Sequence, residues 1–186
     1  SMIKKIIILI FILSSSAHAE YKLNNLTDKL KSPWSITVVK ENIYLINEKS
    51  GNIKIFDRIQ NNIKEIPHNL KVLEHGQGGL LDIFYYEGKV YVSYSEERDS
   101  TMKSSTSVAV ANFNEQRLDF RNIFQSEPPI RSGYHFGSRI VIKDKHLYVS
   151  SGERGGDRIG QEADKHPGSI IRINLDGTVP NDNPKF

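Results

Sequence analysis

Glycines surround a single glutamine in the segment 75–79, which reads HGQGG. A glycine backbone can approach a ligand closely because no side chain intervenes. The amide of Gln77 can both donate and accept hydrogen bonds. Gln77 is therefore a candidate contact for the hydroxyl groups of a ligand; the alternative is a glycine-rich turn with an exposed glutamine.

His135 is the candidate for proton transfer. It lies between Tyr134 and Phe136 and precedes Gly137, so the imidazole is expected beside aromatic surface at the entrance of a strand. An apolar surrounding favours the neutral ring, the form that a general base needs. Strand alternation would turn His135, Gly137 and Arg139 to one face. The alternative is a histidine with a structural role.

The segment 152–158, GERGGDR, concentrates charges and glycines. Such a loop suits an anionic cofactor or a polar substrate, and the alternative is a solvated loop between strands. The acidic residues at 153, 157, 162 and 164 lack the spacing of a calcium-binding loop. We therefore assign no metal ligand.

Composition and missing motifs exclude several classes of function. The chain has no cysteine, which excludes thiolate metal sites and thiol nucleophiles. No run of five Lys or Arg residues occurs, so the charge pattern of a nucleic-acid binder is missing. Hydrolase and nucleotide-binding motifs are also missing. The histidines at 68, 146 and 166 are expected in exposed turns.

The elements that must position these residues are short β-strands. Runs rich in Ile, Val, Tyr and Phe are separated by Gly, Asn, Asp and Lys, with little helical periodicity. The runs predict strands at 35–39, 43–47, 53–57 and 63–66, then at 80–85, 89–95, 107–112 and 117–123. A third set begins at 139–142 and continues at 147–150 and 169–174. The fold class is therefore all-β.

A strand, a polar turn and a Tyr-bearing strand open each set: WSITVVKENIYLIN, LLDIFYYEGKVYVSY and RIVIKDKHLYVSSG. A four-stranded unit that recurs at roughly 50 residues is typical of a β-propeller. Two complete blades and part of a third are expected. A β-sandwich is the alternative, although it does not explain the recurring phrase.

The first 19 residues have the pattern of a secretory signal peptide. Lys4 and Lys5 precede an apolar run at 6–13, and Ala17-His18-Ala19 resembles a cleavage site. We expect cleavage before Glu20, and Ser1 ahead of Met2 carries no fold information. Since a propeller needs four to eight blades, residues 20–186 are expected to be the N-terminal part of a truncated propeller. Its open strand edge would favour association, for instance as a homo-oligomer.

Five segments, in this order, resemble the soluble glucose/sorbosone dehydrogenases: LKSPWSITV at 30–38, GQGGLLDI at 76–83, YHFGSRIVI at 134–142, LYVSSGERG at 147–155 and GSIIRINLDGTVPNDNP at 168–184. That resemblance implies a six-bladed propeller, of which this chain supplies about the first three blades. It also implies pyrroloquinoline quinone (PQQ) and calcium as cofactors, held mostly by later blades.

The same resemblance implies a reaction and three site residues. His135 corresponds to the base that takes a hydroxyl proton while the sugar carbon delivers a hydride to the quinone, and Gln77 and Arg154 correspond to substrate contacts. The expected function is oxidation of an aldose at its anomeric hydroxyl to the lactone, with a soluble electron acceptor. The signal peptide predicts a location in the periplasm or outside the cell. We expect neither a nucleic-acid partner nor a membrane span after cleavage. GERGGDR differs from the GDQGRNQ of glucose-specific members, which favours the broader aldose dehydrogenases. The alternative is a non-catalytic or inactive propeller module that binds a glycan or a protein.

Overall fold

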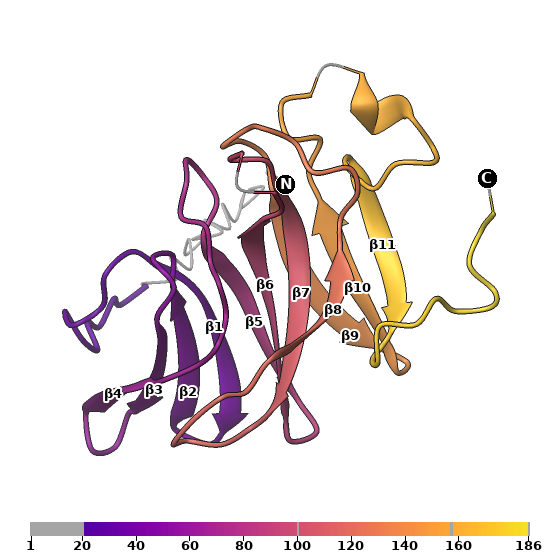
Figure 1. Ribbon diagram of the computed structural model, residues 1–186. Helices are drawn as coiled ribbons and strands as arrows, with labels where there is room; N and C mark the ends of the chain where they lie inside the picture. The colour runs from indigo at the N-terminus through magenta and orange to yellow at the C-terminus, as the bar shows by residue number, and fades with distance from the viewer. Residues whose placement is uncertain (1–20, 100, 157, 186) are drawn as a thin grey trace, which may run out of the picture.

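The computed structural model describes residues 21–99, 101–156 and 158–185, in which all strands belong to three antiparallel sheets arranged side by side (Figure 1). The predicted signal peptide lies outside the described residues. A single 3-10 turn, η1 (Ile159–Gln161), is the only helical element of the described part. Within these ranges no helix has the length and apolarity to cross a membrane.

The first sheet is a four-stranded meander in chain order. Each strand agrees with its predicted position to within two residues. The strands are β1 (Pro33–Lys40), β2 (Ile43–Glu48), β3 (Ile53–Asp57) and β4 (Asn62–Ile66).

The second sheet has the same meander order and corrects one predicted strand. The strands are β5 (Leu80–Tyr86), β6 (Lys89–Glu97), β7 (Ser104–Asn112) and β8 (Arg121–Gln125). The predicted strand at 117–123 was wrong at its start, because Leu118 instead forms a parallel bridge with His68 and donates its N–H to the Pro67 carbonyl at 3.0 Å. This segment therefore ties the second sheet to the end of the first.

The third sheet has three described strands. They are β9 (Gly137–Lys143), β10 (His146–Ser151) and β11 (Ser169–Asn174), with β10 in the middle. The 17 residues between β10 and β11 form the loop that carries η1 and the GERGGDR segment. All three predicted strands of this set are confirmed.

Apolar side chains fill both gaps between the sheets. One cluster, including Leu45, Ile83 and Val92, joins the first sheet to the second, and another, including Tyr91, Val108 and Leu147, joins the second to the third. Burial of each such side chain contributes roughly 1.5–3 kcal/mol. Because the second sheet is covered on both faces, β7, one of its two central strands, is buried from Ser104 to Ala111. This stacking is that of successive propeller blades, as predicted.

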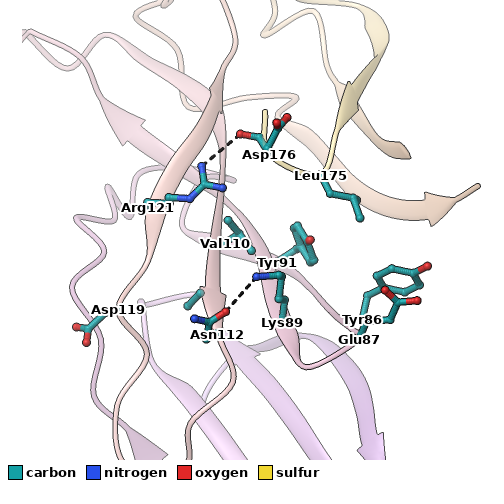
Figure 2. Close-up of a pocket in the computed structure, with 11 residues that line it drawn as sticks. Tyr86, Glu87, Lys89, Tyr91, Val110, Asn112, Asp119, Arg121, Leu175 and Asp176 are labelled. Carbon is teal, nitrogen blue, oxygen red and sulfur yellow. Dashed lines mark hydrogen bonds between the residues drawn. The ribbon is translucent and has the colours of Figure 1, made fainter. Parts of the chain in front are cut away.

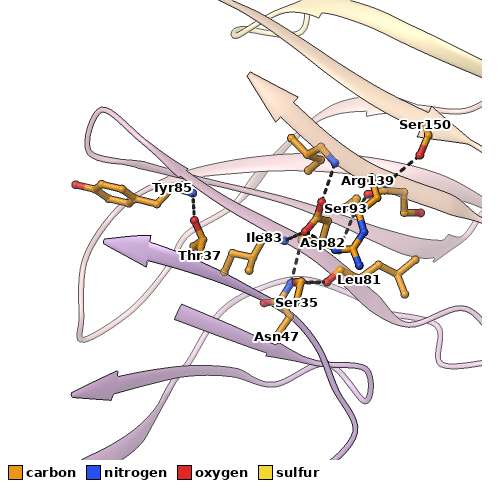
Figure 3. Close-up of polar contacts among 12 residues, drawn as sticks. Ser35, Thr37, Asn47, Leu81, Asp82, Ile83, Tyr85, Ser93, Arg139 and Ser150 are labelled. Carbon is orange, nitrogen blue, oxygen red and sulfur yellow. Dashed lines mark hydrogen bonds and ion pairs between the residues drawn. The ribbon is translucent and has the colours of Figure 1, made fainter. Parts of the chain in front are cut away.

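Asp82 on β5 joins neighbouring inner strands (Figure 3). Its carboxylate, which is almost fully buried, accepts hydrogen bonds from the N–H of Ile140 at 2.7 Å and from the Arg139 guanidinium at 3.3 Å. Asn47 on β2 donates to the Leu81 and Asp82 carbonyls. Ser35 on β1 donates from its hydroxyl to the same Leu81 carbonyl at 2.7 Å. Since β1, β5 and β9 are thus held side by side, the loops that lead into them meet at one end of the molecule.

Candidate functional site

His135 belongs to the loop that leads into β9. Its φ is 50°, and Gly137 and Ser138 also have positive φ values of 68° and 76°. Strand alternation therefore does not extend back to His135, and the prediction that His135, Gly137 and Arg139 share a strand face was wrong. Arg139 instead places its guanidinium 4.1 Å from the centre of the Trp34 ring on β1.

The His135 ring pairs with a carboxylate. Nδ1 of His135 lies in very short hydrogen-bonding contact with Oε1 of Glu153. The hydrogen bond from His135 is the main reason that the pKa of the Glu153 carboxyl lies below its usual range. Both side chains are partly open to solvent, at 52% for His135 and 41% for Glu153. The surroundings of the ring are therefore more polar than the neighbouring aromatic residues predicted.

Glu153 is the residue that sequence reasoning missed. It was considered as part of the charged loop 152–158 and of an acidic spacing pattern, but not as a partner of His135, which lies 18 positions away in the sequence. The position of Glu153 at the start of the loop after β10 could have indicated the pairing, since β9 and β10 are antiparallel neighbours. The residue before β9 and the residue after β10 must then lie at the same end of the sheet.

Gln77, the other candidate contact from the sequence, lies beside His135. Its Oε1 accepts the His135 N–H at 2.8 Å, and its own N–H donates to the Gly133 carbonyl at 2.7 Å. Gly76 has a φ of +60°, and a Cβ there would lie 2.4 Å from the Gly133 oxygen. Glycine at position 76 is therefore required for the two loops to approach one another, and the amide nitrogen of Gln77 remains as a donor for a ligand.

Gly152 allows the third segment to join this site. A Cβ at Gly152 would lie 1.9 Å from the carbonyl oxygen of His135, and the Gly152 N–H donates to the Phe136 carbonyl at 3.1 Å. Any larger residue would force apart the loops that carry His135 and Glu153.

Arg154 does not lie at the open surface with the other predicted site residues. Its relative exposure is 2%, and its guanidinium carbon lies 3.6 Å from the centre of the Phe136 ring. Nε donates to the Tyr134 carbonyl at 2.9 Å, and Nη1 donates to the Ser104 carbonyl at 2.7 Å. Nη2 donates to the Ser104 hydroxyl at 3.0 Å and to the Ser132 carbonyl. This geometry favours a role inside the loop over the predicted contact with a substrate.

Two further side chains border the site. Tyr134 is 61% exposed, and its ring centre lies 6.1 Å from that of His135. Lys49, at the β2–β3 turn, donates from Nζ to the Gly76 carbonyl at 2.5 Å. An exposed aromatic ring beside hydrogen-bonding groups can bind a cyclic ligand that has polar groups at its edge and apolar faces.

Among the described residues, the site consists of a histidine, a carboxylate and an amide, and it does not form a cofactor cage. Within the described ranges, no group of three or more His, Asp or Glu side chains could hold a metal ion. Arg139 supplies one cation from the inner strand β9, already paired with Asp82. These groups do not fit the three carboxylates of PQQ together with calcium, so no cofactor ligand is assigned.

A separate cavity lies at the other end of the strands (Figure 2). Its volume is about 410 Å³, and it lies between the second and third sheets. Tyr86 at the end of β5 and Leu175 after β11 line it, whereas Gln77 and His135 precede β5 and β9. The cavity therefore has no contact with the His135–Glu153 pair.

Three blades with a histidine–carboxylate pair at the entrances of the inner strands define a β-propeller with a polar site at one mouth. The family model described as Glucose / Sorbosone dehydrogenase matches residues 30–186. The chain belongs to this family.

Individual relatives agree with this assignment. The chain is 31% identical to the aldose sugar dehydrogenase YliI of Escherichia coli over 91% of its own length and 48% of the relative's. The crystal structure of the soluble aldose sugar dehydrogenase from E. coli, in its apo form, superposes with a TM-score of 0.80 at 29% identity, covering 86% of this chain and 48% of that one. The structure of the PQQ-bound aldose sugar dehydrogenase of Streptomyces coelicolor has the same fold, with a TM-score of 0.74 at 23% identity. The superposition covers 88% of this chain and 50% of that one. The chain thus spans about half the length of these relatives.

Proposed function

We propose that this chain forms the substrate side of a quinone-dependent dehydrogenase that oxidises an aldose at its anomeric hydroxyl to the lactone. The observation that carries the proposal is the His135–Glu153 pair, held next to the Gln77 amide at the mouth of the inner strands. Family membership and the aldose sugar dehydrogenase activity named for the E. coli relative support it.

The contact with Glu153 determines which nitrogen of His135 can act as the base. A carboxylate only accepts hydrogen bonds, so Nδ1 carries the hydrogen, and in the neutral form of the ring it is Nε2 that has the lone pair. Nε2 then takes the proton of the anomeric hydroxyl, while the hydride leaves the same carbon and the carbonyl of the lactone forms. Glu153 stabilises the imidazolium that results, as a carboxylate beside a histidine does in other enzymes. Gln77 and the exposed Tyr134 ring orient the sugar.

PQQ, when bound, would supply the two-electron acceptor for this hydride. The relative from S. coelicolor is described in its PQQ-bound form, and we propose PQQ together with calcium as the cofactors here. Their ligands would come from chain outside the residues described. A soluble electron acceptor and an exported location, directed by residues 1–19, complete the proposal.

The test is dye reduction by the full-length gene product with PQQ, calcium and a panel of aldoses. We expect turnover with at least one aldose, and loss of kcat by at least 10²-fold in His135→Asn, the size expected for a general base. Lys71→Gln, at an exposed position that is not among the site residues, is the matched control and should keep native kcat. A folded protein with no turnover on any aldose would contradict the proposal and favour a glycan-binding propeller module.

A further inference from the structure

Arg154 is a buried cation whose hydrogen bonds converge on the loop that carries His135. Burial lowers the pKa of its guanidinium to about 10, so the side chain remains charged at neutral pH. A buried charge is tolerated when protein dipoles replace its water shell. Here the carbonyls of Ser132, Tyr134 and Ser104 and the hydroxyl of Ser104 replace it.

The acceptors lie on two different parts of the molecule. Ser104 begins β7 and is 1% exposed, so it belongs to the rigid second sheet. Its N–H and carbonyl also pair with those of Ile130. Ser132 and Tyr134 belong to the loop that leads into β9. One guanidinium therefore fastens this loop to the second sheet.

Arg154 also contacts the residues on both sides of His135. Its Nε binds the Tyr134 carbonyl, and its guanidinium lies on the Phe136 ring. Phe136 is buried in turn. Its ring packs closely on Gly78, where an added Cβ would lie only 2.8 Å from the ring. Arg154 thus contacts residues 134 and 136 from the buried side of the loop, and His135 between them is exposed at the surface.

Backbone strain shows why this support is needed. His135 and Arg154 both have positive φ values, 50° and 63°, in the left-handed region that non-glycine residues rarely adopt. Such conformations persist only where surrounding contacts over-determine them. Glu153 immediately precedes Arg154. The contacts of the Arg154 side chain therefore also fix the backbone from which the Glu153 carboxylate extends.

We propose that Arg154 is a positioning residue that holds the side chains of His135 and Glu153 within hydrogen-bonding distance of each other. Its effect on catalysis rests on the proposed function, but the contact itself can be measured without turnover. The readout is the pKa of the Glu153 carboxyl, which the hydrogen bond from His135 lowers.

The experiment is a ¹³C NMR titration of the Glu153 carboxyl in the whole chain. The variants are Arg154→Ala, Arg154→Lys and, as the reference without the pair, His135→Asn. In Arg154→Ala we expect the midpoint to move most of the way from the native value up to that of His135→Asn. Methylguanidinium added to Arg154→Ala should restore most of the shift, because it can refill the cavity with the same donors. Arg154→Lys should be intermediate, since a lysine keeps the charge but lacks the planar fork.

Leu45→Ala is the control for a loss of stability alone. Leu45 is fully buried between the first and second sheets, so its truncation should lower the unfolding temperature and leave the Glu153 midpoint at its native value. A native midpoint in both Arg154 variants would overturn the proposal, and if Arg154→Ala does not fold, Arg154→Lys decides it. Because no activity is measured, failure of the proposed function would leave this result intact.

In the full-length gene product the same role predicts a split between kinetic constants. Misplacement of a base by about 1 Å can cost on the order of 10²-fold in rate, so kcat of Arg154→Lys should fall about 10- to 100-fold with little change in KM. A residue that contacts the sugar would instead raise KM. A change in KM alone would overturn the positioning role and restore the predicted substrate contact.

Discussion

At the scale of single residues, the site depends on a contact between two partly exposed side chains. Glu153 is in its carboxylate form throughout the neutral range, because the pKa of its carboxyl lies below the usual value. A group whose folded pKa is lowered contributes stability above its unfolded pKa, and this contribution is lost as the pH falls through the folded pKa. The pair should therefore persist at neutral pH and dissociate only in acid.

Replacement of the carboxylate tests its share of the chemistry. We expect Glu153→Gln to lower kcat by at least about 10-fold and up to about 10⁴-fold, the loss found when an amide replaces the carboxylate beside the catalytic histidine of a serine protease. The measurement is the dye-reduction rate of the full-length gene product. Glu162→Gln, in the same loop and exposed, is the matched control; an equal loss of rate in both variants would contradict a specific role for Glu153.

At the scale of elements, the loops before β5, before β9 and after β10 approach one another at glycines. Gly76 and Gly152 each have a backbone carbonyl of another loop where a Cβ would be. The positions of the inner strands, held by Asp82 (Figure 3), make this approach possible. The strands thus determine where the loops start, and the glycines determine how closely they pack.

Gly152→Ala should separate these loops. The new Cβ would overlap the His135 carbonyl oxygen, and overpacking of this kind costs about 1–3 kcal/mol of stability. The free energy of unfolding in urea measures it. At Gly160 the nearest atom to a Cβ is the Glu153 Cβ at 3.4 Å, so Gly160→Ala should stay within about 0.5 kcal/mol of the native protein. Equal effects at the two positions would show that the close approach at Gly152 does not constrain the fold.

The loop after β10 also has a pH-sensitive contact. His166 was predicted in an exposed turn, but it is partly buried: Nδ1 accepts the Glu127 N–H at 2.8 Å, and the His166 N–H donates to the Glu127 carbonyl at 3.0 Å. Burial lowers the pKa of His166, against a smaller opposing effect of the Glu127 carboxylate. The unfolded chain therefore binds the proton more readily, so stability is full above the usual histidine pKa and is lost as the pH falls through the lowered one.

His166→Asn should remove this dependence. An asparagine keeps an acceptor in the place of Nδ1 but does not titrate, so the unfolding temperature should fall less between pH 7 and about pH 5 than in the native chain. His75→Asn, at an exposed histidine, should keep the native slope. Identical slopes in the native chain and His166→Asn would refute the assignment.

At the scale of the whole molecule, the first and third sheets of the described residues carry exposed apolar side chains. Ile36 and Val38 on β1 are 59% and 58% exposed, and Ile170 on β11 is 76% exposed. Among the described strands, β11 is also an edge of the third sheet. An apolar edge strand with unpaired backbone groups favours association.

A charge on that edge should reduce self-association. We expect Ile170→Lys to shift the native chain toward the monomer at equal concentration, as measured by light scattering after size-exclusion chromatography. Ile59 is equally exposed, at 76%, but lies in the turn after β3. Ile59→Lys should therefore leave the distribution unchanged, and an equal response of both variants would show that β11 is not the contact.

The sequence alone predicted the strands apart from the start of β8, their blade-like repetition, and His135 and Gln77 as candidate site residues. These follow from local patterns: alternation of apolar residues, turns between them, and glycines around polar side chains. Only the tertiary structure decided that Glu153 pairs with His135, that Arg154 is buried under the loop, and that residues 117–119 join the first blade rather than begin β8. The reason is physical. The contacts of Arg154 and Leu118 form between different blades, and the His135–Glu153 pair forms between two loops that meet only because β9 and β10 pair, so all three depend on how strands and sheets pack rather than on local sequence patterns.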